Sequence, residues 1–353
     1  ILVTAFFGSI SVGLLFKAIS HRFKEKVAWL AALIFAFYPE SVLLGAAQMR
    51  DRILIGLAAL AFFMVEQWHS MRLRRFIWFG LALAVLAAFS WLIAIAVGAM
   101  VCLWWWIDYS SGLANRQRRL MGWAFLALVA IAGYTLFSRW LSSSAAWDVT
   151  LAIRNSGWIS ALFENLPSSL QVPFIVVYGL LQPVLPAAIF DPSIPIWTGI
   201  TTVLSLGWYL LFPILLYAGI ALYKMQPDLE RKLLITSLAA VGIWAIISSL
   251  RAGGDVWDNP RYRTLLLPWI ALVAAWAWNN AHTHRDGWLS RWYIVAGIFV
   301  AFFSNWYLYR IYNYGLLISF WVMIGLIVLF SALVLGQGLF REFQARGNPL
   351  TRE

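Results

Sequence analysis

Charged side chains are scarce in this sequence. Asp, Glu, Lys and Arg make up 12% of its 353 residues, whereas 62% are hydrophobic. Because about a quarter of the residues in a soluble domain are charged, this composition excludes an ordinary soluble protein. Short segments that alternate polar and apolar residues are also missing, while apolar runs of about twenty residues recur. We therefore expect an all-α polytopic membrane protein.

Several familiar site motifs are missing as well. The single cysteine, Cys102, excludes an internal disulfide, and it lies in an apolar run where we expect a small core residue. GxxxxGK[ST], HExxH and GxSxG do not occur, so nothing supports a nucleotide-driven pump, a zinc protease or a serine hydrolase. The "HTH" at 282–284 lacks a third ligand and is weak support for a metal site.

Apolar segments and basic connections alternate along the chain. They predict about eleven transmembrane helices in one membrane domain, 1–353. The run 76–107 is too long for one crossing at 1.5 Å per residue, and we expect a break near Phe89 and Ser90. The expected helices lie at about 1–16, 27–45, 52–65, 76–89, 91–107, 121–138, 198–223, 233–250, 263–281, 293–309 and 316–335.

The net charge of +11 follows the positive-inside pattern of membrane proteins, so we expect no nucleic-acid partner. One set of connections, with the C-terminal tail from Gly336, carries 18 of the 26 Lys and Arg, and the opposite set carries 8. The first set is therefore expected to be cytoplasmic. Residues 139–197 must then form an outer loop. Their prolines favour interfacial or re-entrant helices, although a kinked transmembrane helix is the alternative.

The stretch "GAAQMRDRILIG" (45–56) places three charges between apolar segments, at the outer end of an expected helix. Burying charge in lipid costs several kcal/mol per group. Asp51 can cap the helix, but Arg50 and Arg52 oppose the positive end of its dipole. Glu40, just past a kink expected at Pro39, is either a second carboxylate of the same cavity or a structural partner of Arg50 or Arg52.

A second stretch, "SLRAGGDVWDNPRYRTLLLPW" (249–269), repeats this arrangement at another outer helix end. We expect Asp258 or Asn259 as the cap and Pro260 at the first helical position, with two arginines in the first turn. Gly253 and its glycine neighbour leave the backbone free to bend. The candidate binding residues here are Arg251, Asp255, Asp258, Arg261, Tyr262 and Arg263.

Two helix N-termini that carry arginines on one side of a membrane predict a site for a phosphate or diphosphate. Helix N-termini bind anions, and arginine binds phosphate oxygens bidentately. The alternative is that the arginines reach lipid headgroups while nearby carboxylates neutralise them.

The segment "VAWLAALIFAFYPESVLLGAAQMRDRILIGLAALAFF" (27–63) resembles bacterial GT-C glycosyltransferases, the family of protein O-mannosyltransferases and lipid A aminoarabinose transferase. Pro39, Arg50 and Asp51 carry the resemblance, which covers roughly residues 1–110. It implies transfer of a sugar from a polyprenyl-phosphate donor to a hydroxyl of a protein, lipid or glycan at the outer face, usually with inversion. It also implies that Asp51 is an assisting acid that positions substrate or binds a divalent metal. The residues implied to bind the donor phosphate are Arg50, Arg52, Arg261 and Arg263.

The family's general base lies in the loop after its first helix, whereas the opening segment here matches the family's second helix. We therefore expect the native chain to begin upstream of Ile1, and the base to lie there. The implied location is a bacterial inner membrane with a cytoplasmic C-terminus. Two alternatives remain: an O-antigen polymerase or ligase, and a non-catalytic lipid-phosphate-binding or structural subunit. A flippase is disfavoured because the helix interiors carry almost no charge.

Overall fold

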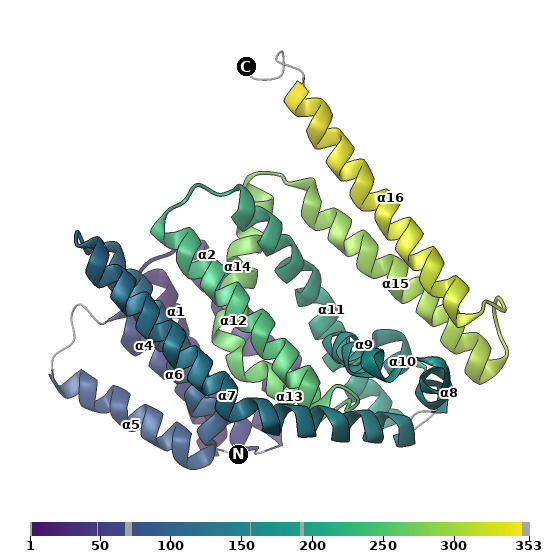
Figure 1. The fold of residues 1–353 in the computed structure, drawn as a ribbon, viewed down its shortest axis with the longest axis horizontal. Coiled ribbons are helices and arrows are strands. Elements are labelled where there is room, and N and C mark those ends of the chain that lie inside the picture. The colour runs from purple at the N-terminus through teal and green to yellow at the C-terminus, as the bar shows by residue number, and fades with distance from the viewer. Residues whose placement is uncertain (1, 48, 68–72, 156, 191–193, 348–353) are drawn as a thin grey trace. The chain divides into compact units, whose positions relative to one another are not determined.

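A computed structural model of the protein describes residues 2–47, 49–67, 73–155, 157–190 and 194–347. Two residues of the basic stretch 71–75 and the end of the C-terminal tail fall outside these ranges. Within them the chain forms helices and no strand (Figure 1), so the all-α prediction is confirmed. The helices are α1 (Leu2–Ser20), α2 (Glu25–Phe37), α3 (Pro39–Ala46), α4 (Arg50–Glu66), α5 (Leu73–Phe89), α6 (Trp91–Ser111), α7 (Arg116–Asn155), α8 (Gly157–Asn165), α9 (Ser168–Leu180), α10 (Leu185–Ile189), α11 (Pro195–Lys224), α12 (Leu229–Ala252), α13 (Asp258–Arg263), the 3₁₀ turn η2 (Thr264–Leu266), α14 (Leu267–Thr283), α15 (Gly287–Tyr312) and α16 (Phe320–Gly347).

Six helices of the described part are long and apolar enough to cross a membrane: α1, α6, α11, α12, α15 and Phe320–Gln344 of α16. The bent pair α2–α3 makes a seventh if it forms one span. This agrees with a helical membrane protein, but the expected count of about eleven is not confirmed. One reason is length, because α4 and α14 have 17 residues each, and an average bilayer core needs roughly 20.

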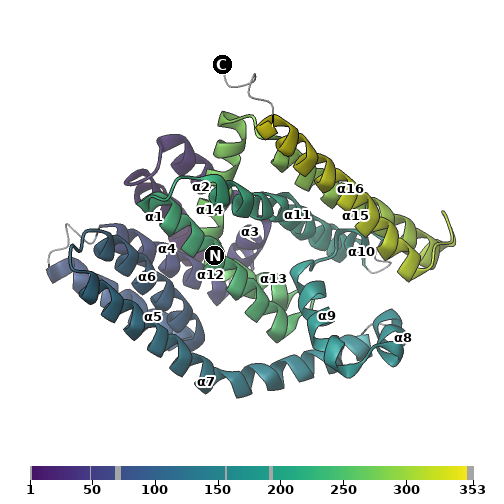
Figure 2. The same ribbon diagram turned by 45° about the horizontal axis from the view of Figure 1, so that its top comes forward.

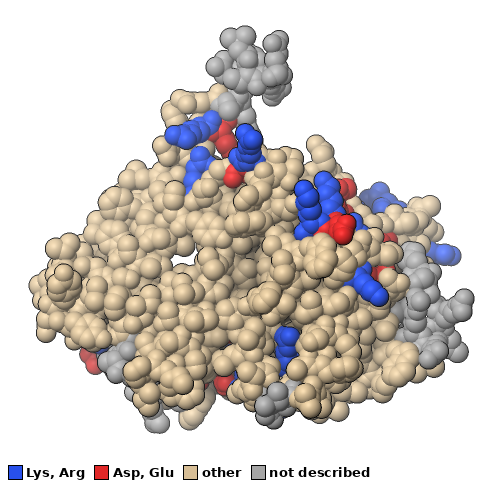
Figure 3. Space-filling model, turned by 180° about the vertical axis from the view of Figure 1, so that it is seen from behind, with Lys and Arg blue, Asp and Glu red and all other residues tan. Residues whose placement is uncertain are grey.

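Large apolar side chains lie on the outside of the long helices. Leu128 on α7, Ile243 on α12 and Val328 on α16 are 65%, 60% and 61% exposed. On the face drawn in Figure 3, Lys, Arg, Asp and Glu form a few separate groups, and the surface between them is uncharged. Such a surface suits contact with lipid rather than with water.

The helix expected at 27–45 bends by 47° between α2 and α3. The bend lies at Tyr38, which has φ −60° and ψ 123°, because the residue before a proline is pushed out of the α region. The kink predicted at Pro39 is therefore confirmed, and Glu40, which follows it, is buried. The predicted break between α5 and α6 is also confirmed, at the extended residue Ser90.

The predicted outer loop at 139–197 is more helical than expected. Helix α7 continues to Asn155, so that residues 139–155 prolong a 40-residue helix instead of opening a loop. Neither glycine nor proline interrupts this part of the sequence before Gly157. Three short helices follow, and α9 keeps Pro173 inside it. As the prolines predict, no single unbroken helix crosses this segment, while the side of the membrane on which it lies stays a prediction.

Contacts between helices divide the chain into two compact units. The first comprises Ile1–Gln182 and Leu222–Trp276. In it α1 packs against α2 and α4, while α12 packs against α6, α7 and α9 (Figure 2). The buried ring of Phe62 lies 5.0 Å from that of Trp104 and 5.4 Å from that of Trp269, between centroids. This aromatic core joins α4, α6 and the start of α14.

The second unit comprises Pro183–Ala221 and Ala277–Glu353. Helices α15 and α16 lie side by side in it (Figures 1 and 2). The Tyr217 hydroxyl donates to Asp286 Oδ2 at 3.3 Å and accepts from Asn280 Nδ2 at 3.0 Å, which joins α11 to the end of α14 and to the connection that follows it. The candidate site residues all belong to the first unit.

Candidate functional site

The two charged stretches singled out in the sequence meet where α4 begins. Asp51 lies in the first turn of α4 and Arg261 lies in the last turn of α13. Arg261 Nε and Asp51 Oδ2 are 3.6 Å apart. The fold thus brings a carboxylate of the first stretch and an arginine of the second into one polar cluster.

Arg261 has a second, closer carboxylate partner. Its Nη1 lies 3.0 Å from Oδ1 of Asp258, one turn earlier on α13. By contrast, Nε is buried and forms no hydrogen bond with any described residue, so the contact with Asp51 is ionic and loose. The Arg261 side chain is 25% exposed, and that of Asp51 is 6% exposed. Arg261 is therefore only partly satisfied and can be reached from outside.

Tyr262 packs beside two guanidinium groups. The guanidinium carbons of Arg251 and Arg261 lie 4.2 Å and 5.2 Å from the centroid of its ring, within cation–π range. Burial raises the pKa of the Tyr262 hydroxyl, which therefore stays protonated at neutral pH and donates to Asp258 Oδ2 at 3.3 Å. The aromatic ring thus holds two cations close together.

Asp255 supports this arrangement from the preceding turn. Its Oδ1 accepts from the backbone N–H groups of Trp257 and Asp258, at 2.7 and 2.8 Å. The Tyr262 carbonyl in turn accepts from Trp244 Nε1 at 2.9 Å. Asp255 and Trp244 therefore fix the backbone of α13, and the predicted binding role of Asp255 stays a prediction.

Arg263 and Glu40 lie in the interior, which corrects two expectations. Arg263 is 1% exposed and donates from Nη2 to the Gln182 carbonyl at 3.0 Å, so that it cannot bind a ligand at the surface. Glu40 is 3% exposed, and its Oε1 lies 3.9 Å from Nη2 of Arg263. The partner of Glu40 is therefore Arg263, and neither Arg50 nor Arg52. We interpret Glu40 as the counter-charge of Arg263 rather than as a catalytic carboxylate.

The Arg50-Asp51-Arg52 triplet is divided among different environments. The Arg50 side chain is exposed and contacts the Phe89 carbonyl from Nη1 at 3.5 Å. Arg52 is buried, donates to the Ser41 hydroxyl and lies over the ring of Phe35. A Cβ atom on Gly8 of α1 would lie 2.6 Å from Arg52 Nη2. Arg52 thus packs among α1, α2 and α3, and the expectation that it binds phosphate is not supported.

The predicted helix caps are wrong. Helix α4 begins after Met49, which makes no side-chain cap, and Asp51 lies inside its first turn. Helix α13 begins after Trp257, so Asp258 and Asn259 are helical and Pro260 is the third residue instead of the first. Since the arginines of α13 lie in its last turn, its N-terminal dipole does not face them. An anion bound here would therefore be held by side chains and not by a helix N-terminus.

Glycines let α9 approach α12 and α13 closely. A Cβ atom on Gly253 would lie 2.5 Å from the Ser249 carbonyl oxygen and 2.6 Å from Ile175 Cγ2. Gly253 has ordinary helical dihedrals, φ −65° and ψ −29°, so it is needed for space and not for the bend that the sequence suggested. Asn259 Nδ2 donates to the Gly179 carbonyl at 3.0 Å. The end of α9 is thereby fixed against α13.

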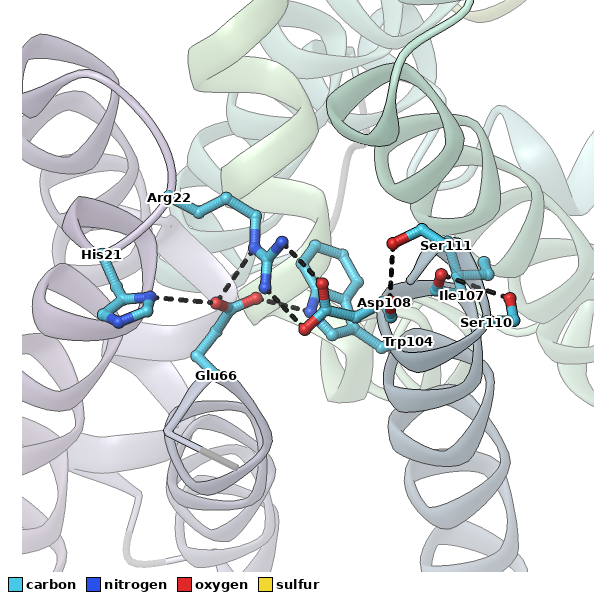
Figure 4. A network of polar contacts seen from close by, with 8 residues as sticks. All are labelled: His21, Arg22, Glu66, Trp104, Ile107, Asp108, Ser110 and Ser111. Atoms are coloured by element: carbon cyan, nitrogen blue, oxygen red, sulfur yellow. Dashed lines mark hydrogen bonds and ion pairs between the residues drawn. The ribbon is translucent and has the colours of Figure 1, made fainter. Parts of the chain in front are cut away.

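A second polar cluster, which was not predicted from the sequence, surrounds Arg22 (Figure 4). Arg22 binds both carboxylate oxygens of Asp108 at 3.0 Å, and its Nε lies 3.2 Å from Oε2 of Glu66. Trp104 Nε1 donates to the buried Glu66, and His21 Nδ1 lies 3.7 Å from it. Burial alone would lower the pKa of Arg22, but the hydrogen bonds and charges of the two carboxylates outweigh it and raise this pKa.

This second cluster lies at the other end of α4 from Asp51, roughly 22 Å away at 1.5 Å per residue. It joins the α1–α2 turn to the ends of α4 and α6. One signal was present in the sequence: Glu66 and Asp108 are isolated acids at the ends of apolar runs, in a chain with only 15 acidic residues. Such acids usually have a specific partner.

The residues around Asp51 do not suit a divalent metal. Its nearest charged partner is the Arg261 guanidinium, which repels a cation. Among the described residues no three His, Cys, Asp or Glu side chains are placed to hold a metal ion, the histidines at 282 and 284 included.

The expectation of a core position for Cys102 is also wrong, because this residue is exposed.

No protein-family model, no curated protein and no solved structure matches this chain. The resemblance in residues 27–63 to GT-C glycosyltransferases therefore stays a prediction, and the polar cluster around Arg261 is the direct guide to function.

Proposed function

We propose that the protein is a membrane glycosyltransferase that moves a sugar from a polyprenyl-phosphate donor to a hydroxyl acceptor. The observation that carries this proposal is the contact between Asp51 and Arg261. It joins the acid of the family-like segment to the later arginine-rich stretch, in a cluster that stays partly exposed. The donor is a lipid-linked sugar, and the acceptor is a glycan, lipid or protein.

In this reaction the bond between the sugar and the donor phosphate breaks, and the acceptor oxygen forms the new bond. The acceptor proton passes to a carboxylate, and the polyprenyl phosphate leaves with the bonding electrons. The leaving group needs positive charge fixed in advance. Arg261 and Arg251 supply it beside Tyr262, and the exposed Arg50 is a third candidate. Asp51 assists by positioning the substrates, and no step requires a metal.

We place this site at the outer face of a bacterial inner membrane, with the C-terminus in the cytoplasm. The support is the uneven distribution of Lys and Arg, 18 against 8, between the two sets of connections. The stretches that hold Asp51 and Arg261 both belong to the sparsely basic set.

The test is release of polyprenyl phosphate by the purified protein in lipid nanodiscs. Arg261→Ala and Asp51→Asn should each lower the turnover rate by at least about a hundredfold, as loss of a preorganised charged group does. The matched control is Arg119→Ala, which removes an exposed arginine of α7 far from the cluster in sequence. Unchanged turnover in both site variants would overturn the assignment, provided that thermal unfolding confirms their folded state.

A non-catalytic lipid-phosphate-binding subunit is the second candidate. The observation that favours it is the burial of the local acids, because the side chains of Glu40 and Asp51 are only 3% and 6% exposed. An O-antigen polymerase or ligase would use the same arginines on a longer glycan donor. In the nanodisc experiment, binding of polyprenyl phosphate without release of sugar from any donor would favour the binding subunit.

A further inference from the structure

Arg261 is shared between two carboxylates that hold it unequally. Asp258 lies on the same helix at 3.0 Å and moves with it. Asp51 lies on α4 at 3.6 Å, and the Nε atom that faces it forms no hydrogen bond within the described part of the chain. The contact between α13 and α4 is therefore the weaker of the two and is the first to yield to a competitor.

The competitor must be an anion that can reach the guanidinium. The Arg261 side chain is 25% exposed, and Arg251 is an exposed residue beside the same tyrosine ring. A phosphate that approached these two arginines would also face the negative charges of Asp51 and Asp258. It can bind only if a guanidinium nitrogen turns toward it, and phosphate accepts two parallel N–H bonds from arginine.

We propose that Arg261 is an anion-operated clamp: without ligand it neutralises Asp51, and a bound phosphate group draws it away and leaves the Asp51 carboxylate free. This deepens the proposed function and rests on the same site. Asp51 is then held inactive by Arg261 until the donor arrives, so that phosphate binding and exposure of the carboxylate are coupled.

The clamp makes Asp51 and the phosphate group competitors for one guanidinium. Neutralising Asp51 therefore strengthens phosphate binding while it weakens sugar transfer. A residue that simply contributes to the phosphate site would weaken both. A general electrostatic effect of Asp51 would strengthen binding whether Arg261 is present or not, whereas release of the clamp requires Arg261.

The experiment is a double-mutant cycle on phosphate binding with Asp51→Asn, Arg261→Gln and both changes, in nanodiscs with polyprenyl monophosphate as the probe. We expect Asp51→Asn to lower the Kd at least about threefold when Arg261 is present, and to change it less than about 1.5-fold in Arg261→Gln. An unchanged or higher Kd in Asp51→Asn would overturn the clamp. So would an equal gain in affinity from Asp51→Asn with Arg261 present and in Arg261→Gln.

A second measurement uses the wild-type protein, so that it does not depend on the folding of any variant. Saturation with polyprenyl monophosphate should raise carbodiimide labelling of Asp51, read by peptide mass spectrometry, relative to labelling without ligand. Equal or lower labelling contradicts the clamp. Inorganic phosphate is the comparison probe: the same response to it assigns recognition to the phosphate group alone, and a response only to the lipid assigns it to the lipid-linked phosphate.

The two proposals fail in different ways. If Asp51→Asn strengthens phosphate binding only when Arg261 is present, but no donor supports sugar transfer, the proposed function is overturned and the clamp stands. Transfer that depends on Arg261, with no gain in binding in Asp51→Asn, overturns the clamp and leaves the function.

Discussion

Arg22 binds both carboxylate oxygens of Asp108 at 3.0 Å, and so it joins the α1–α2 turn to α6. Glu66 completes this network, in which one guanidinium contacts two carboxylates and His21 lies 3.7 Å from Glu66. The cluster at the opposite end of α4 differs, because Arg261 is partly exposed and loosely held. The network of Arg22, Asp108 and Glu66 is typical of a structural ion-pair network, here called the structural tie. The cluster around Arg261 is typical of a binding site.

The structural tie predicts coupled losses of stability. Arg22→Ala and Asp108→Ala should each lower the free energy of unfolding by about 2 kcal/mol, because each removes the bidentate partner of a mostly buried charge. The double variant should lose less than the sum. Thermal unfolding in nanodiscs measures this, and Arg119→Ala controls for loss of a surface arginine. Additive losses would show that the pair is not coupled.

A second prediction concerns the packing of α9 against α12. Gly253→Ala should destabilise the protein by about 1–3 kcal/mol, because its Cβ would collide with the backbone of Ser249 and Ile175. The matched control is Gly242→Ala within α12, which ends just before Gly253, and there the new Cβ meets nothing within 4 Å. The account predicts that only the first variant lowers Tm. Equal Tm values for the two variants would contradict the close approach of α9.

The buried pair of Glu40 and Arg263 predicts a rescue. Arg263→Met should cost about 3–5 kcal/mol of stability, because it leaves the buried Glu40 carboxyl group without its cationic partner. Adding Glu40→Gln removes the acidic group and should restore part of the loss. Unfolding of the single and double variants measures the effect, and a double variant less stable than Arg263→Met would refute the pairing.

The proposed orientation predicts which connections face the cytoplasm. In a Cys102→Ser background, a cysteine at Asn115 should react with a membrane-impermeant maleimide only after the cells are opened. A cysteine at Tyr314, on the connection between α15 and α16, should react in intact cells. Both native residues are exposed. The reverse labelling pattern would invert the topology and place the Arg261 cluster in the cytoplasm.

The sequence predicted the helical breaks well because they depend on local chemistry. Pro39 forces Tyr38 out of the helix, and the run around Ser90 is too long for one crossing. The predicted caps were wrong because several neighbouring residues can start a helix, and α4 and α13 begin after Met49 and Trp257, neither of which makes a side-chain cap. The predicted helix lengths were wrong where residues beyond the expected boundary also favour a helix, as in α7, which continues to Asn155.

The proximity of the two charged stretches was predicted from the sequence, whereas the environment of each arginine was not. Arginines on the side of the membrane that is expected to be poor in basic residues drew attention to the two stretches that hold Asp51 and Arg261. The fold brings these two residues together. Composition could not separate the interior arginines from the accessible ones. Arg52 and Arg263 are buried because particular partners, Ser41 and the Gln182 carbonyl, lie opposite them, and such pairings arise only in three dimensions.

The most direct measurement is the affinity of the purified protein for polyprenyl monophosphate, with and without Arg261. The account predicts that Arg261→Gln weakens binding about tenfold or more, the loss expected for a charge-assisted phosphate contact, while Arg119→Gln binds like the wild type. If the two variants bind equally well, the cluster of Asp51 and Arg261 is not a phosphate site, and the account is wrong.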